Sequence, residues 1–106
     1  MAWVLLLGAI AAEVTGTSAL KYSAGFTRLA PTVVVGVAYI LSFTLLSFAV
    51  KRLQVSIAYA VWSGVGTAAI TVIGLYAFKE PLTVTKVVGV LLIIGGVVTL
   101  NLASPA

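Results

Sequence analysis

Four long apolar stretches, separated by short polar connections, dominate the pattern of this chain. They cover residues 2–20, 32–50, 55–78 and 86–103. A helix that crosses the hydrocarbon core of a bilayer needs about 20 residues, and each stretch has about that length. Helix-breaking residues stand between the stretches, with Gly25 and Pro31 in the first connection and Pro81 in the third. The pattern predicts an all-α integral membrane protein, a single domain (1–106) of four transmembrane helices.

Composition narrows the class of protein further. The chain is 62% hydrophobic and 8% charged, and it contains neither Cys nor His, whereas a soluble domain is about 45–50% apolar and about 25% charged. Without Cys or His there is no disulfide, no Cys/His metal site and no histidine base. We therefore expect no metal, no cofactor, no enzymatic activity and no nucleic-acid partner. The expected location is the inner (plasma) membrane of the cell, as a multi-pass protein.

The orientation of the chain is nearly balanced in charge. The first and third connections, which share one side of a four-helix protein, hold four basic residues, and the second holds two. The Lys/Arg bias that sets orientation is therefore weak. Two hypotheses follow: dual insertion with antiparallel pairing, or a single orientation with the first and third connections cytoplasmic. Separately, Met1-Ala2-Trp3 carries no basic side chain, which favours an uncleaved start over a secretory signal.

Glu13 is the one acidic residue inside an apolar stretch. Burying an ionised carboxylate in hydrocarbon is costly, so such residues usually mark a functional site. Glu13 is then either protonated or exposed to a cavity in which it binds a cation. A carboxylate that does both in turn exchanges protons for cations, because the two compete for one site. The alternative interpretation is that Glu13 hydrogen-bonds a neighbouring helix and only holds the helices together.

The face of the helix around Glu13 carries mostly small side chains. Residues three and four positions away lie beside a helical residue. For Glu13 these are Ala9, Ile10, Gly16 and Thr17. Such a face leaves room for a ligand to approach the carboxylate. It also suits the close packing of another helix, including one from a second copy of the chain.

Aromatic side chains recur at helical spacing in the second and third stretches. The third carries Tyr59, Trp62, Ser63 and Gly66 on one face, and the second carries Tyr39, Ser42 and Phe43. Aromatic rings attract organic cations, so these faces predict a pocket for a lipophilic cation beside the carboxylate. The alternative is an aromatic belt at the membrane surface. Tyr59 fits this alternative because it lies only a few residues inside its stretch.

Glycines give the third and fourth stretches different predicted roles. Gly64 and Gly66 follow Ser63 in mid-span, where paired Gly and Ser often permit a kink, and we interpret them as a hinge; close backbone packing is the alternative. In the fourth stretch, Gly89 and Gly96 lie one heptad apart with Ile93 between them. A stripe of small residues on an apolar helix is typical of helix–helix contact and predicts a dimer interface.

Three motifs together resemble the small multidrug resistance family of proton-coupled transporters. They are Ala12-Glu13-Val14, then Lys21 with Gly25-Phe26-Thr27-Arg28, and Ala58 to Gly66. The resemblance covers the whole chain. It implies an antiparallel homodimer of dual topology that exchanges protons for cations at paired membrane glutamates. It assigns that role to Glu13, substrate contact to Tyr59 and Trp62, pocket lining to Tyr39 and Phe43, and dimerisation to Gly89 and Gly96.

Two features point to different branches of that family. Val14-Thr15-Gly16-Thr17 is similar to the multidrug branch, which carries quaternary ammonium ions, whereas the guanidinium branch typically has Trp at the position of Gly16. The segment Phe78-Lys79-Glu80-Pro81-Leu82 is more like the guanidinium branch. Because Gly16 lies beside the carboxylate, we give it more weight.

The sequence therefore predicts a proton-coupled antiporter that exports hydrophobic and quaternary-ammonium cations from a homodimer in the lipid bilayer. Glu13 would bind the proton or the cation, and Tyr59 and Trp62 would stack on the substrate and hydrogen-bond Glu13. Three alternatives stay open: a guanidinium-type exporter, a passive cation channel, and an accessory membrane subunit that transports nothing.

Overall fold

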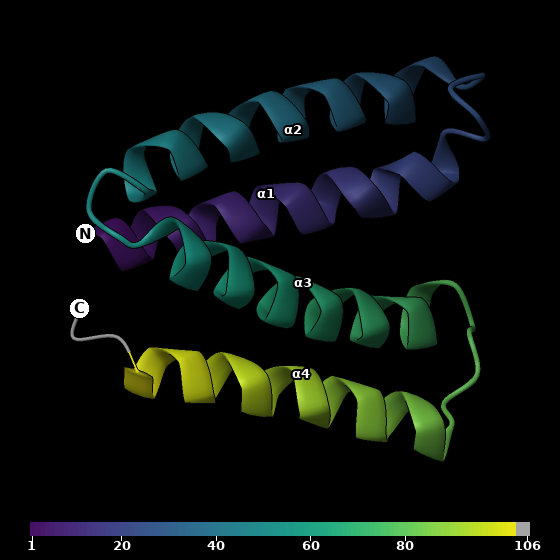
Figure 1. Ribbon diagram of the computed structural model, residues 1–106. Coiled ribbons are helices and arrows are strands. Elements are labelled where there is room, and N and C mark those ends of the chain that lie inside the picture. Colours follow the sequence, from purple (N-terminus) through teal and green to yellow (C-terminus); the bar gives the residue numbers. More distant parts are fainter. Residues whose placement is uncertain (104–106) are drawn as a thin grey trace. The chain divides into compact units, whose positions relative to one another are not determined.

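The computed structural model describes residues 1–103, which form four helices and no strand. They are α1 (Ala2–Tyr22), α2 (Leu29–Ala49), α3 (Val55–Ala77) and α4 (Val84–Ala103). All four are long and apolar enough to cross a membrane. The chain divides into two compact units, Met1–Arg52 and the part from Leu53 onward. Figure 1 shows that each unit is a hairpin, α1 with α2 and α3 with α4.

The connection between α1 and α2 is built around the buried side chain of Ser23. Its hydroxyl donates to the Leu20 carbonyl at 2.7 Å and accepts from the Phe26 N–H at 3.2 Å, so it caps the end of α1. Ala24, Gly25 and Phe26 then have positive φ angles of 49°, 72° and 67°. Only glycine adopts this region at little cost, which explains why Gly25 stands at the centre of the turn.

The helices begin and end within three residues of the predicted stretches. Helix α2 starts at Leu29, three residues before the predicted stretch, and Pro31 occupies its first turn, where a missing N–H costs nothing. Helix α4 starts at Val84, two residues before the predicted start. Such differences are expected at helix ends, because apolar patterning marks the membrane-embedded part and the hydrogen-bonded helix extends beyond it.

Small residues bring α1 and α2 close together in the first unit. The Ser42 hydroxyl is fully buried and donates to the backbone carbonyl of Ala9 at 2.7 Å. A methyl group added at Gly8 would lie 3.3 Å from the side chain of Leu45. Backbones can approach this closely only where side chains are small. The interhelical hydrogen bond fixes the register of the hairpin.

The second unit packs α3 against α4 through Gly64. A Cβ atom added there would lie 2.7 Å from Val97 Cγ2 and 3.5 Å from Ile93 Cγ2. At the far end of α3, the Gly74 carbonyl accepts from the N–H groups of Phe78 and Glu80, at 3.2 and 2.9 Å. Helix α4 has no buried residue and keeps many large apolar side chains exposed, including Leu91, Leu92 and Val98.

Replacing Gly64 with Ala is expected to destabilise the α3–α4 hairpin by about 1–3 kcal/mol, the usual cost of overpacking. The added methyl would overlap Val97, whose branched side chain cannot easily move aside. Unfolding by denaturant in detergent micelles measures the change. Gly36 is the matched control, since a methyl there meets nothing within 4 Å and Ala gains the same helix propensity at both sites.

The double variant Gly64→Ala with Val97→Ala should recover most of the lost stability, because it removes the overlapping methyl groups. If Gly64→Ala and Gly36→Ala proved equally stable, the contact between α3 and α4 at Gly64 would be wrong.

Candidate functional site

The carboxylate of Glu13 lies half-buried in mid-α1 and takes part in a short chain of hydrogen bonds. The Thr17 hydroxyl donates to Glu13 Oε1 at 2.8 Å, and the Tyr39 hydroxyl lies 2.7 Å from Thr17 Oγ1. Tyr39 belongs to α2, so these hydrogen bonds connect the two helices of the hairpin. The structure therefore brings together three residues that the sequence predicted for the site.

Local structure explains why these three side chains meet. Glu13 and Thr17 are four residues apart in α1 and so lie on the same helical face. Gly16 is buried, and a Cβ atom there would lie 3.0 Å from the Tyr39 ring and 3.2 Å from Ala38 Cβ. The absence of that atom lets the tyrosine ring approach α1. The hydrogen bond between Ser42 and Ala9 sets the register that places Tyr39 opposite Thr17.

The face around Glu13 is more filled than the sequence suggested. Gly16 was expected to leave room for a ligand, but the ring of Tyr39 occupies the space beside it. Ala9 and Ile10 are buried as well. Phe43 is 60% exposed. Its part in a cation pocket stays a prediction.

Ionisable groups are scarce around Glu13 in the first unit. Helix α2 contains no Asp, Glu, Lys or Arg from Leu29 to Ala49. Along α1 the nearest charged residue is Lys21, about two helical turns from Glu13. The Thr17 hydroxyl is therefore the hydrogen-bond donor that the α1–α2 hairpin supplies to the carboxylate. A cation could supply the opposite charge.

The predicted residues of α3 belong to the second unit. Tyr59 is 71% exposed, Ser63 is exposed and Trp62 is half-buried. Gly64 and Gly66 are buried within a continuous helix from Val55 to Ala77. Close packing of Gly64 on Val97 supports the alternative to a hinge at that position. The hinge and the contacts of Tyr59 and Trp62 with Glu13 or substrate stay predictions.

The predicted dimer residues lie on α4, which packs on α3 but has no buried residue. A methyl group added at Gly89 or Gly96 would meet no atom within 4 Å. Ile93 is directed partly toward α3, near Gly64, and is 39% exposed. This contact within the hairpin could not be predicted from the sequence, because helical spacing identifies a shared face but not its neighbour. The dimer interface stays a prediction.

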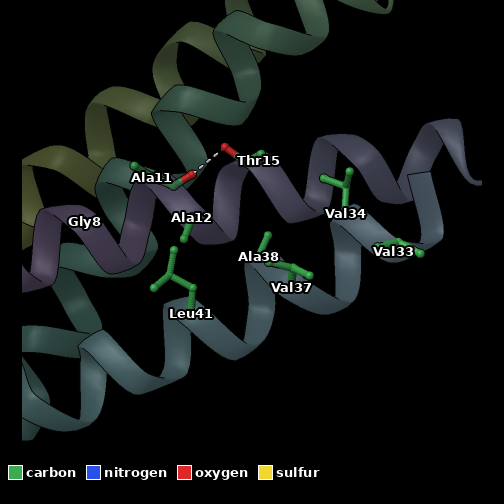
Figure 2. A pocket seen from close by; sticks show the side chains of 9 residues that line it. All are labelled: Gly8, Ala11, Ala12, Thr15, Val33, Val34, Val37, Ala38 and Leu41. Carbon is green, nitrogen blue, oxygen red and sulfur yellow. Dashed lines mark hydrogen bonds between the residues drawn. The ribbon is translucent and has the colours of Figure 1, made fainter. Parts of the chain in front are cut away.

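A separate apolar groove of about 520 Å³ runs along the first hairpin (Figure 2). In α1 it is lined by residues that include Ala11 and Thr15, roughly 160–200° around the helix from Glu13 at 100° per residue. The Thr15 hydroxyl donates to the Ala11 carbonyl at 2.8 Å. The lining is otherwise aliphatic: Gly8, Ala12, Val33, Val34, Val37, Ala38 and Leu41. The groove therefore offers no charge for cation exchange, and we place the candidate site at Glu13.

Comparison with known proteins places the chain in a family. A family model described as Small Multidrug Resistance protein matches residues 1–93. The chain belongs to the small multidrug resistance family. This confirms the resemblance inferred from the motifs around Glu13 and in α3, and it makes the chain a multi-pass membrane protein.

Three relatives within the family illustrate its range. The chain is 52% identical to multidrug resistance protein mmr of Mycolicibacterium paratuberculosis over 103 residues, 96% of each chain. It is 48% identical to quaternary ammonium compound-resistance protein QacE of Escherichia coli, over 98% of this chain and 94% of that protein. It is 47% identical to the nicotine metabolites export pump subunit NepA of Paenarthrobacter nicotinovorans, over 94% and 86%.

Proposed function

We propose that the chain is a multidrug efflux transporter that exchanges protons for hydrophobic and quaternary-ammonium cations. The observation that carries the proposal is Glu13, a half-buried carboxylate within a membrane-spanning helix, bonded on one oxygen by Thr17. Glu80 is the only other acidic residue of the sequence and lies in the connection after α3. The names of the relatives mmr and QacE support cationic substrates.

Competition at Glu13 is enough to couple the two fluxes. A carboxylate that binds a proton cannot at the same time neutralise an organic cation, so each ligand displaces the other. When the site opens alternately to the two sides of the membrane, proton entry then drives cation exit. Tyr59 and Trp62 are proposed to stack on the substrate, since aromatic faces attract organic cations.

The working form is proposed to be an antiparallel homodimer in the inner membrane, with both orientations made. Four helices of about 20 residues enclose little volume, and the near balance of basic residues on the two sides permits both insertions. Pairing through Gly89 and Gly96 is supported by the open space that a methyl group would find at both positions. Each copy would contribute one Glu13 to the transport site.

A guanidinium-type exporter is the second candidate, favoured by the segment from Phe78 to Leu82.

If the multidrug proposal is right, purified protein should bind tetraphenylphosphonium more tightly than guanidinium, with affinity that falls as the pH is lowered, because protons compete for Glu13. Equilibrium binding at several pH values measures both trends. Preference for guanidinium would move the chain to the second candidate.

The same preparation separates the two remaining alternatives. An accessory subunit would bind neither cation at any pH. A passive channel would conduct cations through proteoliposomes without a saturable exchange for protons, whereas an antiporter should release protons when a cation binds and should concentrate the cation only when a proton gradient is applied.

A further inference from the structure

The hydroxyl groups of Thr17 and Tyr39 form a chain that ends on the carboxylate of Glu13. Thr17 Oγ1 lies 2.8 Å from Glu13 Oε1 and 2.7 Å from Tyr39 Oη. All three side chains are half-buried. A hydrogen bond to an ionised group is roughly twice as strong as a bond between neutral groups. These hydrogen bonds therefore link the ionisation of Glu13 in α1 to the hydroxyl group of Tyr39 in α2.

The packing of the hairpin holds this chain in place. A Cβ atom at Gly16 would lie 3.0 Å from both Cδ1 and Cε1 of Tyr39, so the ring lies directly against the α1 backbone. Sliding of one helix along the other is opposed by the buried Ser42 hydroxyl, which bonds the Ala9 carbonyl at 2.7 Å. Both restraints keep the Tyr39 hydroxyl within reach of Thr17.

The direction of this hydrogen-bond chain depends on the protonation of Glu13. A threonine hydroxyl has one hydrogen to donate. When Glu13 is ionised, that hydrogen points to Oε1, and Tyr39 must be the donor to Thr17. When Oε1 carries a proton, Glu13 donates to Thr17, and the Thr17 hydrogen turns toward the oxygen of Tyr39. A proton on Oε1 therefore reverses this hydrogen-bond chain, whereas ionised Glu13 receives it.

Within the first unit, the hydroxyl groups of Thr17 and Tyr39 are the polar groups that support the carboxylate of Glu13. From α2, the helix that packs against α1, Tyr39 is the titratable side chain that faces Glu13, and the helix has no charged residue. On α1 itself Lys21 and Tyr22 lie at the end of the helix. Within this hairpin, Oε1 of Glu13 accepts the hydrogen bond from Thr17.

We propose that Thr17 and Tyr39 are positioning residues that set the pH at which a cation replaces the proton on Glu13. They hold Oε1 through hydrogen bonds that are stronger when the carboxylate is ionised. The inference rests on the proposed exchange at Glu13. It adds that the pH dependence of that exchange is set by two hydroxyl groups, neither of which needs to touch the substrate.

The test measures tetraphenylphosphonium binding to the purified full-length protein across a pH series, with the midpoint as the readout. Thr17→Val keeps the shape of the side chain but removes the donor. The ionised form of Glu13 then loses more than the protonated form, so the proton binds more tightly and the midpoint moves to higher pH. We expect a shift of about one pH unit, equivalent to about tenfold tighter proton binding.

Tyr39→Phe should move the midpoint in the same direction by a smaller amount, because it removes only the second bond of the chain. Thr17→Ser keeps the hydroxyl and should return the midpoint to that of the unaltered protein. Thr15→Val is the matched control, since the Thr15 hydroxyl donates to the Ala11 carbonyl on another face of α1. A merely structural role for Thr17 would change affinity equally at every pH.

An unchanged midpoint in Thr17→Val and Tyr39→Phe would overturn the inference. If Thr17→Val cannot be purified folded, Tyr39→Phe decides by itself, because it keeps the ring that packs on Gly16. Glu13→Gln separates this inference from the proposed function. If that variant loses pH-dependent binding while Thr17→Val keeps its midpoint, only the role of the hydroxyl groups is wrong. If Glu13→Gln keeps pH-dependent binding, the exchange at Glu13 is wrong.

Discussion

Glu13→Gln is expected to reduce proton-driven cation transport to background and to abolish the release of protons when a cation binds. Glutamine has nearly the same shape as glutamate and can still accept the hydrogen bond from Thr17. It can neither carry a negative charge nor take up a proton near neutral pH. The loss would therefore follow from the missing ionisation and not from a damaged helix.

Proteoliposomes that contain the purified variant measure this directly, with uptake of tetraphenylphosphonium driven by an imposed pH gradient. Glu80→Gln is the matched control, because Glu80 is the only other acidic residue and lies in the connection after α3, beside Gly74. That variant should transport at close to the normal rate. Concentrative transport by Glu13→Gln would exclude the proposed mechanism.

Gly96→Leu is expected to weaken the dimer by about 10- to 100-fold and to lower transport in parallel. A leucine on the proposed contact face would force the two α4 helices apart, at an overpacking cost of about 1–3 kcal/mol. In the described α3–α4 hairpin, a methyl group added at Gly96 would meet no side chain within 4 Å. The substitution should therefore leave the α3–α4 hairpin unchanged and act only between copies.

Gly95→Leu provides the control for that experiment. Gly95 is equally open and adjacent in sequence, but it lies about 100° around the helix from Gly96, away from the face that Gly96 shares with Gly89. It should pair and transport normally. Dilution of the protein in detergent, followed by cross-linking or mass measurement, gives the dimer affinity. Equal weakening by both substitutions would argue against the Gly89–Gly96 face as the interface.

The helices could be predicted from the sequence because the bilayer imposes a simple rule. A spanning segment must be long, apolar and internally hydrogen-bonded. A stretch such as residues 32–50 can therefore be recognised as a membrane-spanning helix from its length and apolar composition. Helix ends were less certain, because hydrogen bonding continues into the polar connections. The turn centred on Gly25 shows why: its capping depends on the buried Ser23 hydroxyl, which no hydropathy pattern reveals.

The candidate site could likewise be predicted only in part from the sequence. Glu13 stands out in the sequence because a carboxylate in hydrocarbon is costly and needs a reason. Thr17 and Tyr39 could be assigned to helical faces by their spacing, but spacing does not say which side chain of α2 lies opposite which side chain of α1. That pairing depends on the register of the hairpin, which the Ser42–Ala9 hydrogen bond sets.

By itself, therefore, the sequence determined the membrane-spanning class, the four helices, the family resemblance and the importance of Glu13. Each follows from residue type and order along the chain, which are local properties. Only the tertiary structure decided that the Tyr39 ring fills the space beside Gly16, that its hydroxyl bonds Thr17, and that Gly64 is packed against Val97. Those contacts join residues that are distant in sequence, and close packing between two helices, not periodicity within one, selects them.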